Sequence, residues 1–220
     1  NKGKKGKVIL YNLRLNIKDI KNIISAVKEY LFSYEKFKKK FSPINNLSDL
    51  KIFIKERSAY VSQATLYGYL KTRMGLKTTL MFTDDVFIQS VNKSKWHIFG
   101  TCVSDLLFYT CSYLKSQNKI GNLSLQNIYE DIIDREKTNG MPSDICESLK
   151  KNFEKKLPLF NENYFNDIPF KDSGYALYHW APIAEDLKKL DKEVVLNSMA
   201  YKWNAVVSDF KKLSRDAKNF

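Results

Sequence analysis

Residues 83–117 read TDDVFIQSVNKSKWHIFGTCVSDLLFYTCSYLKSQ, and this stretch decides the fold class. Thr83 is a favourable residue for a helix N-cap, and Asp84 and Asp85 place negative charge in the first turn after it. The stretch contains no proline, and Gly100 is its weakest point for helix formation. The sequence therefore predicts one long helix over these residues.

The most apolar part of this helix extends from Trp96 to Leu114. Polar residues interrupt it, and His97 and Asp105 are the most polar of them. A helix that spans a bilayer needs about 20 largely apolar residues. We therefore expect this segment to be the buried central helix of a bundle and not a membrane span.

Helical periodicity continues on both sides of the central helix, with apolar residues at spacings of three and four. Residues 158–181 differ, because proline, glycine and asparagine cluster there and predict a long connection. The expected fold is an all-α, single-domain bundle of about six helices with a long loop before the C-terminal helix. The expected helices cover residues 17–40, 48–74, 83–117, 124–139, 142–157 and 182–220, the last as one helix or as two end to end.

Capping residues mark several helix ends. Ser48 followed by Asp49 is the expected start of the second helix, and Gly75 is its expected end. Ser124 is the expected start of the fourth helix. The last helix carries an apolar stripe that we expect to be buried: Val195, Met199, Trp203, Val206, Phe210 and Leu213.

Composition excludes several classes of protein. The chain has 220 residues, 44% hydrophobic and 28% charged, which excludes a chain without a folded core. Eight glycines and five prolines are too few for a turn-rich β-sandwich or a Gly-rich nucleotide-binding fold. Three cysteines cannot form a full disulfide framework, so we expect a reducing compartment, either the cytoplasm or the mitochondrial matrix.

Positive charge is concentrated near the N-terminus, where residues 1–40 hold 12 of the 37 Lys and Arg residues but only three acidic residues. We predict a basic arm over residues 1–16 and a helical domain over residues 17–220. Residues 1–40 are expected to contact a membrane surface, nucleic acid or an acidic protein face. The alternative is a solvated Lys-rich surface. The lysines expected to contact the anionic partner are Lys2, Lys4, Lys5, Lys7, Lys38, Lys39 and Lys40.

Two of the predicted helices each carry a stripe of small and polar residues. Because residues three or four positions apart share one helix face, the two stripes could pack against each other. They would then form either a polar pocket for a small ligand or a hydrogen-bonded seam. Gly68 and Gly100 lie beside the stripes, and we expect a close helix crossing at Gly68. The stripe residues are Ser58, Ser62, Thr65 and Arg73 on one helix, and His97, Thr101, Ser104 and Asp105 on the other.

The sequence contains no recognisable motif for a metal or a cofactor. Neither His97 nor His179 follows an acidic residue by three positions, which is the spacing of helical metal sites. Cys102, Cys111 and Cys146 lack the spacing of a zinc site. A Gly-rich phosphate loop is also absent from the sequence. We therefore expect no metal and no cofactor.

One short segment could support nucleophilic chemistry. Ser173 lies six residues before His179, and a serine paired with a histidine is a common basis for ester hydrolysis. The G-x-S-x-G motif of many hydrolases is absent. We expect Ser173 and His179 to lie beyond hydrogen-bond distance, with His179 packed against Trp180. A hydrolase that uses this pair or the polar seam is one alternative function.

About half of the chain resembles other proteins. The resemblance is carried by four segments: 58–75 (SAYVSQATLYGYLKTRMG), 81–87 (MFTDDVF), 102–106 (CVSDL) and 180–184 (WAPIA). They resemble an alphaproteobacterial protein family of unassigned function whose members are sometimes labelled esterases. The resemblance implies an alphaproteobacterial or organellar origin and an intracellular setting. It supplies no catalytic residues.

The favoured function is a non-enzymatic accessory or assembly protein that docks on a larger protein complex, including one at a membrane surface. Three features favour it: no catalytic constellation is recognisable, positive charge lies at one end, and aromatic residues make up 14% of the chain. Aromatic side chains are common anchors in protein interfaces. The alternatives are an ester hydrolase of unusual type and a helical protein that binds nucleic acid through backbone phosphates.

Overall fold

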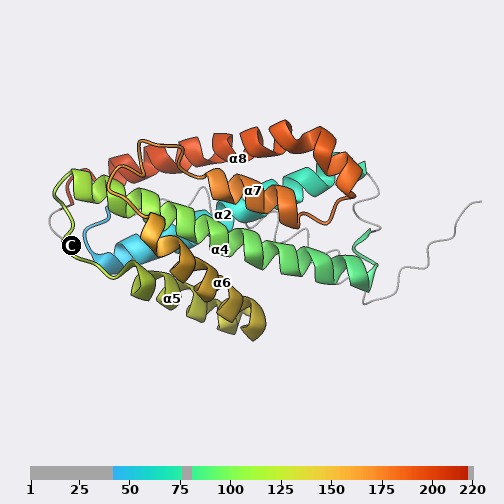
Figure 1. Ribbon diagram of the computed structural model, residues 1–220, viewed down its shortest axis with the longest axis horizontal. Coiled ribbons are helices and arrows are strands. Elements are labelled where there is room, and N and C mark those ends of the chain that lie inside the picture. Colours follow the sequence, from blue (N-terminus) through green and yellow to red (C-terminus); the bar gives the residue numbers. More distant parts are fainter. Residues whose placement is uncertain (1–41, 76–80, 218–220) are drawn as a thin grey trace, which may run out of the picture.

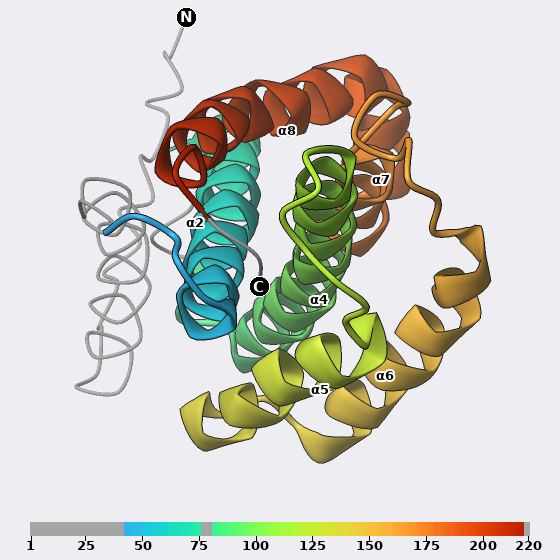
Figure 2. The same ribbon diagram turned by 90° about the vertical axis from the view of Figure 1, so that its left-hand side faces the viewer.

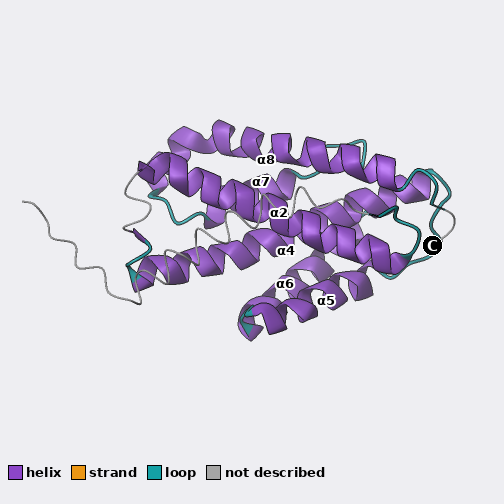
Figure 3. Cartoon of the chain, turned by 180° about the vertical axis from the view of Figure 1, so that it is seen from behind, coloured by secondary structure: helices purple, strands orange, loops and turns teal. Residues whose placement is uncertain are grey.

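The computed structural model describes residues 42–75 and 81–217, and all regular secondary structure in these ranges is helical (Figure 3). The expected all-α class is therefore confirmed. The six α-helices in these ranges are α2 (Leu47–Met74), α4 (Asp85–Ser116), α5 (Leu125–Arg135), α6 (Ser143–Lys156), α7 (Lys171–Trp180) and α8 (Glu185–Leu213). Two short 3-10 helices, η2 (Glu136–Asn139) and η3 (Leu157–Leu159), follow α5 and α6.

Helix α4 lies at the centre of the bundle, as its sequence predicts. The other five α-helices surround it (Figure 2), and α4 extends along most of the length of the bundle (Figure 1). Every residue from 96 to 112 is buried except Thr101, which is half-buried. This burial explains why the segment is apolar on all sides and not on one stripe alone.

Two helices begin at a residue other than the expected one. Asn46, and not Ser48, caps α2, because its backbone is extended and its side chain accepts a hydrogen bond from the Asp49 N–H. Asp84, and not Thr83, caps α4 through bonds from two backbone N–H groups. In each case the sequence offers two good capping residues within three positions, and the backbone geometry selects one of them.

The expected ends at Gly75 and Ser124 are confirmed. Gly75 has a φ of 52° and follows the last residue of α2. The Ser124 side chain accepts a hydrogen bond from the Asn127 N–H at the start of α5.

The expected long loop over residues 158–181 is wrong in its second half, because residues 171–180 form α7. Small residues on one face of α7 allow it to pack between α4 and α8. Ser173, Gly174 and Ala176 are buried, and a Cβ atom on Gly174 would lie 3.0 Å from a methyl carbon of Leu196 in α8. Tertiary packing thus overrides the weak helix propensity of this segment.

Helix α8 is one continuous helix, and its expected apolar stripe faces the core. Val195, Met199, Trp203, Val206 and Phe210 are buried, whereas Leu213 is half-buried.

The basic arm 1–16, the predicted helix 17–40 and the seven candidate lysines lie outside the described residues. In the ranges that are described, no helix combines the length and the apolar character that a membrane crossing requires.

Candidate functional site

The charged residues of the two polar stripes bond to other elements and not to each other, so the predicted hydrogen-bonded seam is not observed in the described ranges. Among the described residues, no hydrogen bond joins the stripe of α2 to the stripe of α4. Arg73 of α2 forms an ion pair with Asp191 of α8, and Tyr69 also donates to Asp191. The charged groups of the two stripes bond to other elements because a buried polar group is satisfied by whichever partner the packing brings near it.

The hydroxyl groups of α2 bond mainly within their own helix. Thr65 donates to the carbonyl oxygen of Val61, and Ser62 donates to that of Ala59. Ser58 is fully buried, and its hydroxyl has no hydrogen-bond partner in the described part of the chain.

The stripe of α4 faces α7 and the loop before it. Asp105 is 1% exposed and accepts a hydrogen bond of 2.8 Å from the Ser173 N–H of α7. The Tyr164 hydroxyl donates to the other carboxylate oxygen at 3.4 Å. Burial raises the pKa of Asp105 to about 6, because removal from water disfavours the ionised carboxylate.

Ser173 and His179 do not form a catalytic pair, as expected. Ser173 is fully buried; its hydroxyl donates to the Phe170 carbonyl and accepts from the Trp203 indole N–H, both at 2.9 Å. His179 is exposed and packs edge-on against Trp180, also as expected. Six residues of helix separate the two side chains by about 9 Å along the axis of α7.

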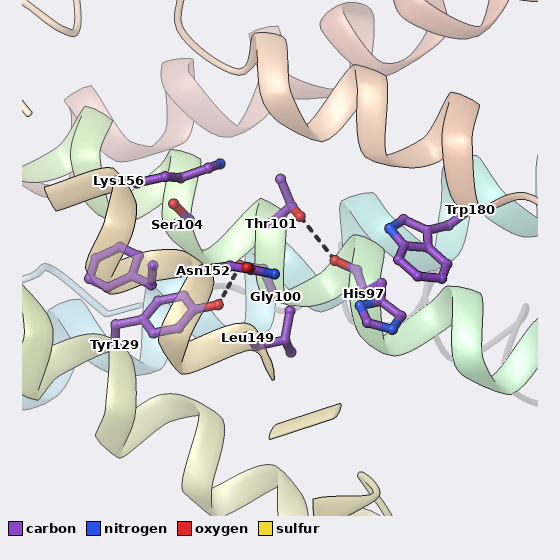
Figure 4. Close-up of a pocket in the computed structure, with 10 residues that line it drawn as sticks. His97, Gly100, Thr101, Ser104, Tyr129, Leu149, Asn152, Lys156 and Trp180 are labelled. Atoms are coloured by element: carbon purple, nitrogen blue, oxygen red, sulfur yellow. Dashed lines mark hydrogen bonds between the residues drawn. The ribbon is translucent and has the colours of Figure 1, made fainter. Parts of the chain in front are cut away.

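A pocket of about 270 Å³ lies where α4 is covered by α5, α6 and the end of α7 (Figure 4). Helix α4 supplies four of the residues that line it: His97, Gly100, Thr101 and Ser104. A Cβ atom on Gly100 would lie 2.6 Å from methyl carbons of Leu149 in α6. Gly100 therefore allows α6 to approach α4 closely, beside the pocket.

The rest of the pocket wall is mainly aromatic and apolar, with one amide side chain, Asn152, and one cation. Tyr129 of α5 stacks on Phe153 of α6 and donates a hydrogen bond to the Gly100 carbonyl oxygen (Figure 4). Lys156 of α6 lines the pocket and forms an ion pair of 2.7 Å with Asp172 of α7. The mixture of apolar walls with a few polar groups is typical of small-molecule sites.

His97 is the polar residue at one end of the pocket. Its imidazole stacks on the Trp180 indole with a distance of 3.7 Å between ring centres (Figure 4). Burial, with a further contribution from the positive charge of Lys93, lowers the pKa of His97 to about 4. The imidazole is therefore neutral at pH 7.

The sequence identified the α4 side of this pocket and missed the opposite wall. Tyr129, Leu149, Phe153 and Lys156 lie on two short helices whose contacts with α4 are not encoded in any local pattern. The available signal was Gly100, because a glycine within a long buried helix indicates a close neighbour. The other glycine of the predicted seam, Gly68, has nothing within 4 Å of the position of a Cβ atom.

The described residues contain no group of His, Cys, Asp and Glu side chains that could hold a metal ion. Cys102, Cys111 and Cys146 are all buried free thiols. Burial raises the pKa of Cys111 to about 12 and also raises that of Cys102, so these thiols are poor nucleophiles at pH 7.

Comparison of the chain with protein-family models, curated proteins and solved structures finds no match. The resemblance to an alphaproteobacterial family therefore stays a prediction.

A second candidate site is the outer side of α8. Leu190, Val194 and Tyr201 are 78%, 68% and 73% exposed, and Leu187 is also exposed. At 100° per residue these side chains and five uncharged neighbours fall within a sector of about 120°. We call this surface the uncharged face of α8; it consists of Leu187, Leu190, Val194, Asn197, Ser198, Tyr201, Asn204, Ala205 and Ser208, all of them exposed.

Proposed function

We propose that this protein is a non-enzymatic accessory or assembly protein that docks on a larger protein partner through the uncharged face of α8. The single observation that carries the proposal is the exposure of Leu190, Val194 and Tyr201 on one side of one helix. Apolar surface that is contiguous and exposed is a common feature of interaction sites.

The absence of charge on this face supports the proposal further. Charged residues make up 28% of the chain, yet none falls on the face between Leu187 and Ser208, a length of about 32 Å. The centres of protein interfaces are depleted in charged residues and enriched in aromatic ones such as Tyr201. The occupant we propose is a partner helix with an apolar stripe of similar length.

The hydrolase alternative loses its specific candidate pair, because Ser173 is sealed in the core by its bonds to Phe170 and Trp203. Ser104 and His97 are also separated by two helical turns, about 10 Å. No specific observation on the described residues favours ester hydrolysis.

As part of the same proposal, residues 1–40 provide a second contact, with an acidic protein face or an anionic membrane surface. Their positive charge supports this role. We place the protein in the cytoplasm or the mitochondrial matrix, where its three buried free thiols fit a reducing environment.

A crosslinking experiment with a matched control tests the docking face. A photoreactive amino acid replaces Val194 on the face or Val86 at the start of α4; these valines are 68% and 72% exposed. In the native cells we expect a discrete crosslinked partner from position 194 and none from position 86. Val194→Glu should abolish co-purification of that partner, whereas Val86→Glu should not, with helicity unchanged in both.

The salt dependence of partner binding distinguishes docking on a protein from binding to nucleic acid. A partner on an uncharged face stays bound at high salt, whereas nucleic acid held by phosphate contacts is released. Retention of the crosslinked partner by Val194→Glu would contradict the proposal. A crosslink between two copies of this chain would show that the face is a homodimer interface instead.

A further inference from the structure

We propose that the pocket between α4, α5, α6 and α7 binds a small, flat, uncharged molecule with a hydrogen-bonding group at each end. This site is separate from the uncharged face of α8, and the inference does not depend on the docking function. It rests on a buried hydroxyl without a partner at one end of the pocket, on the neutral His97 imidazole at the other end, and on the charge balance around them.

The first polar group of the pocket is the Ser104 hydroxyl. Ser104 is 3% exposed, lines the pocket and has no hydrogen-bond partner for its hydroxyl among the described residues (Figure 4). Most buried hydroxyls in helices bond to a carbonyl oxygen one turn earlier, as Thr101 does to His97. A buried hydroxyl without a partner costs about 1–3 kcal/mol, so Ser104 is expected to bond to something within the pocket.

The second polar group of the pocket is the His97 imidazole. The ring is 8% exposed and stacked on Trp180, which fixes its plane, yet neither ring nitrogen has a hydrogen-bond partner in the described ranges. A neutral imidazole offers one donor and one acceptor. His97 and Ser104 lie two turns apart on the same side of α4, so their polar groups are separated by about 10 Å.

The space between these two groups is largely apolar, and the exposed amide side chain of Asn152 in α6 also lines it (Figure 4). Leu149 and the stacked rings of Tyr129 and Phe153 form the wall opposite α4, and the Tyr129 hydroxyl is already bonded to the Gly100 carbonyl. A ligand that reaches both ends therefore has an apolar, flat middle. The volume of about 270 Å³ lies just below the range of roughly 300–1,000 Å³ typical of drug-sized ligands.

The charges around the pocket favour an uncharged ligand. His97 is neutral at pH 7, and Lys156, the one cation that lines the pocket in the described part of the chain, is paired with Asp172. An anionic ligand would have to compete with Asp172 for Lys156, and a cation would meet Lys156 itself. Because an unpaired buried charge is costly, a ligand with neutral donors and acceptors fits best.

The test uses 4-hydroxybenzamide as a probe, with 4-hydroxybenzoate as its anionic counterpart of the same shape. The full chain is titrated at pH 7 while NMR records the ring signals of His97 and Trp180. We expect saturable shifts of both residues with the amide and at least tenfold weaker binding of the benzoate. Benzamide, which lacks the second polar end, should also bind more weakly than 4-hydroxybenzamide.

Two variants locate the probe in the pocket. Ser104→Ala should raise the dissociation constant of 4-hydroxybenzamide about tenfold, and His97→Phe should do the same while preserving the stack on Trp180. The matched control is Ser112→Ala, because Ser112 is a buried serine of α4 whose hydroxyl is bonded within the helix and lies outside the pocket. It should leave binding unchanged.

Several outcomes would overturn the inference. A titration of wild-type protein without shifts at His97 would show that the pocket holds water only. Tighter binding of the benzoate would identify an anion site. An equal loss of affinity in Ser112→Ala and Ser104→Ala would show that the effect is not local to the pocket. The comparison of the three probes needs no variant, so it remains decisive if a substitution impairs folding.

Discussion

Helices α2 and α4 carry similar polar stripes in the sequence, but the structure uses them differently. Arg73 of α2 finds a carboxylate partner, Asp191, on α8. Asp105 and His97 of α4 are buried and form no ion pair in the described ranges, and burial shifts the pKa of each so that its neutral form is favoured. A polar stripe therefore predicts the burial of polar groups but does not predict whether they remain charged.

The largest change in the free energy of unfolding is expected from Asp105→Asn. The pKa of Asp105 in the folded protein, about 6, lies above the unfolded value of 3.8, so the ionised form destabilises the fold above pH 6. This cost decreases as the pH falls below 6 and vanishes below about 4. The variant should be more stable than the wild type by on the order of 3 kcal/mol at pH 8, with no difference near pH 4.

Chemical denaturation followed by circular dichroism at several pH values measures this difference. His97 acts in the opposite direction, because its pKa in the folded protein, about 4, lies below the ordinary histidine value of 6.5. The wild type and Asp105→Asn therefore both lose stability through His97 as the pH falls from 6.5 toward 4. The difference between their unfolding free energies then reports the contribution of Asp105 alone. If Asp105→Asn is less stable than the wild type at pH 8, the hydrogen bonds to Asp105 stabilise its ionised form enough to offset the cost of burial.

The next largest effect should come from Asp191→Asn, which removes the countercharge on the α2 side. Asp191 is buried and also accepts from Tyr69, whereas the Arg73 side chain is 32% exposed. Removal of one partner from a buried ion pair costs 3–5 kcal/mol and much less at the surface. We expect a loss of about 2 kcal/mol in the unfolding free energy. A loss equal to that of Lys189→Ala, an exposed α8 control, would mean that the pair contributes nothing.

The glycines of the two helices provide the third comparison. Gly100→Ala places a methyl group 2.6 Å from Leu149 and should destabilise the protein by about 1–2 kcal/mol. It should also perturb the pocket, which would appear as shifted NMR signals of Tyr129 and His97. An unchanged denaturation midpoint would show that Leu149 simply rotates away.

The smallest effect is expected from Gly68→Ala. Gly68 has open space around the Cβ position, so the substitution gains helix propensity without a steric cost. The denaturation midpoint should rise, corresponding to a gain of up to about 1 kcal/mol. The expectation from the sequence was a close approach at Gly68, and the structure places that approach at Gly100 instead. A lower midpoint in Gly68→Ala would restore the original expectation.

Much of the fold was predictable because local signals decide helix ends. Ser124 and Gly75 act through their own backbone and side chains, so their roles could be read from neighbouring residues alone. Helix α7 was not predictable in this way. It packs against α4 and α8, and its Gly174 lies close to Leu196, which is 22 positions later in the chain, so its contacts are not local.

The pocket was predictable only in part. His97, Thr101 and Ser104 share a side of α4 by helical spacing alone. Their partners were not predictable, because Tyr129 and Leu149 reach the pocket through the packing of α5 and α6 and not through any pattern near α4.

Helix α8 shows which features of a helix its own sequence predicts and which it does not. Its helical spacing predicted a buried apolar stripe through Val195 and Trp203, and the structure confirms that burial. The exposed apolar side chains of Leu190 and Val194 on the opposite side were not predicted. Which side of α8 is covered depends on how α2 and α7 pack against it, and this is a property of distant surfaces that no local pattern contains.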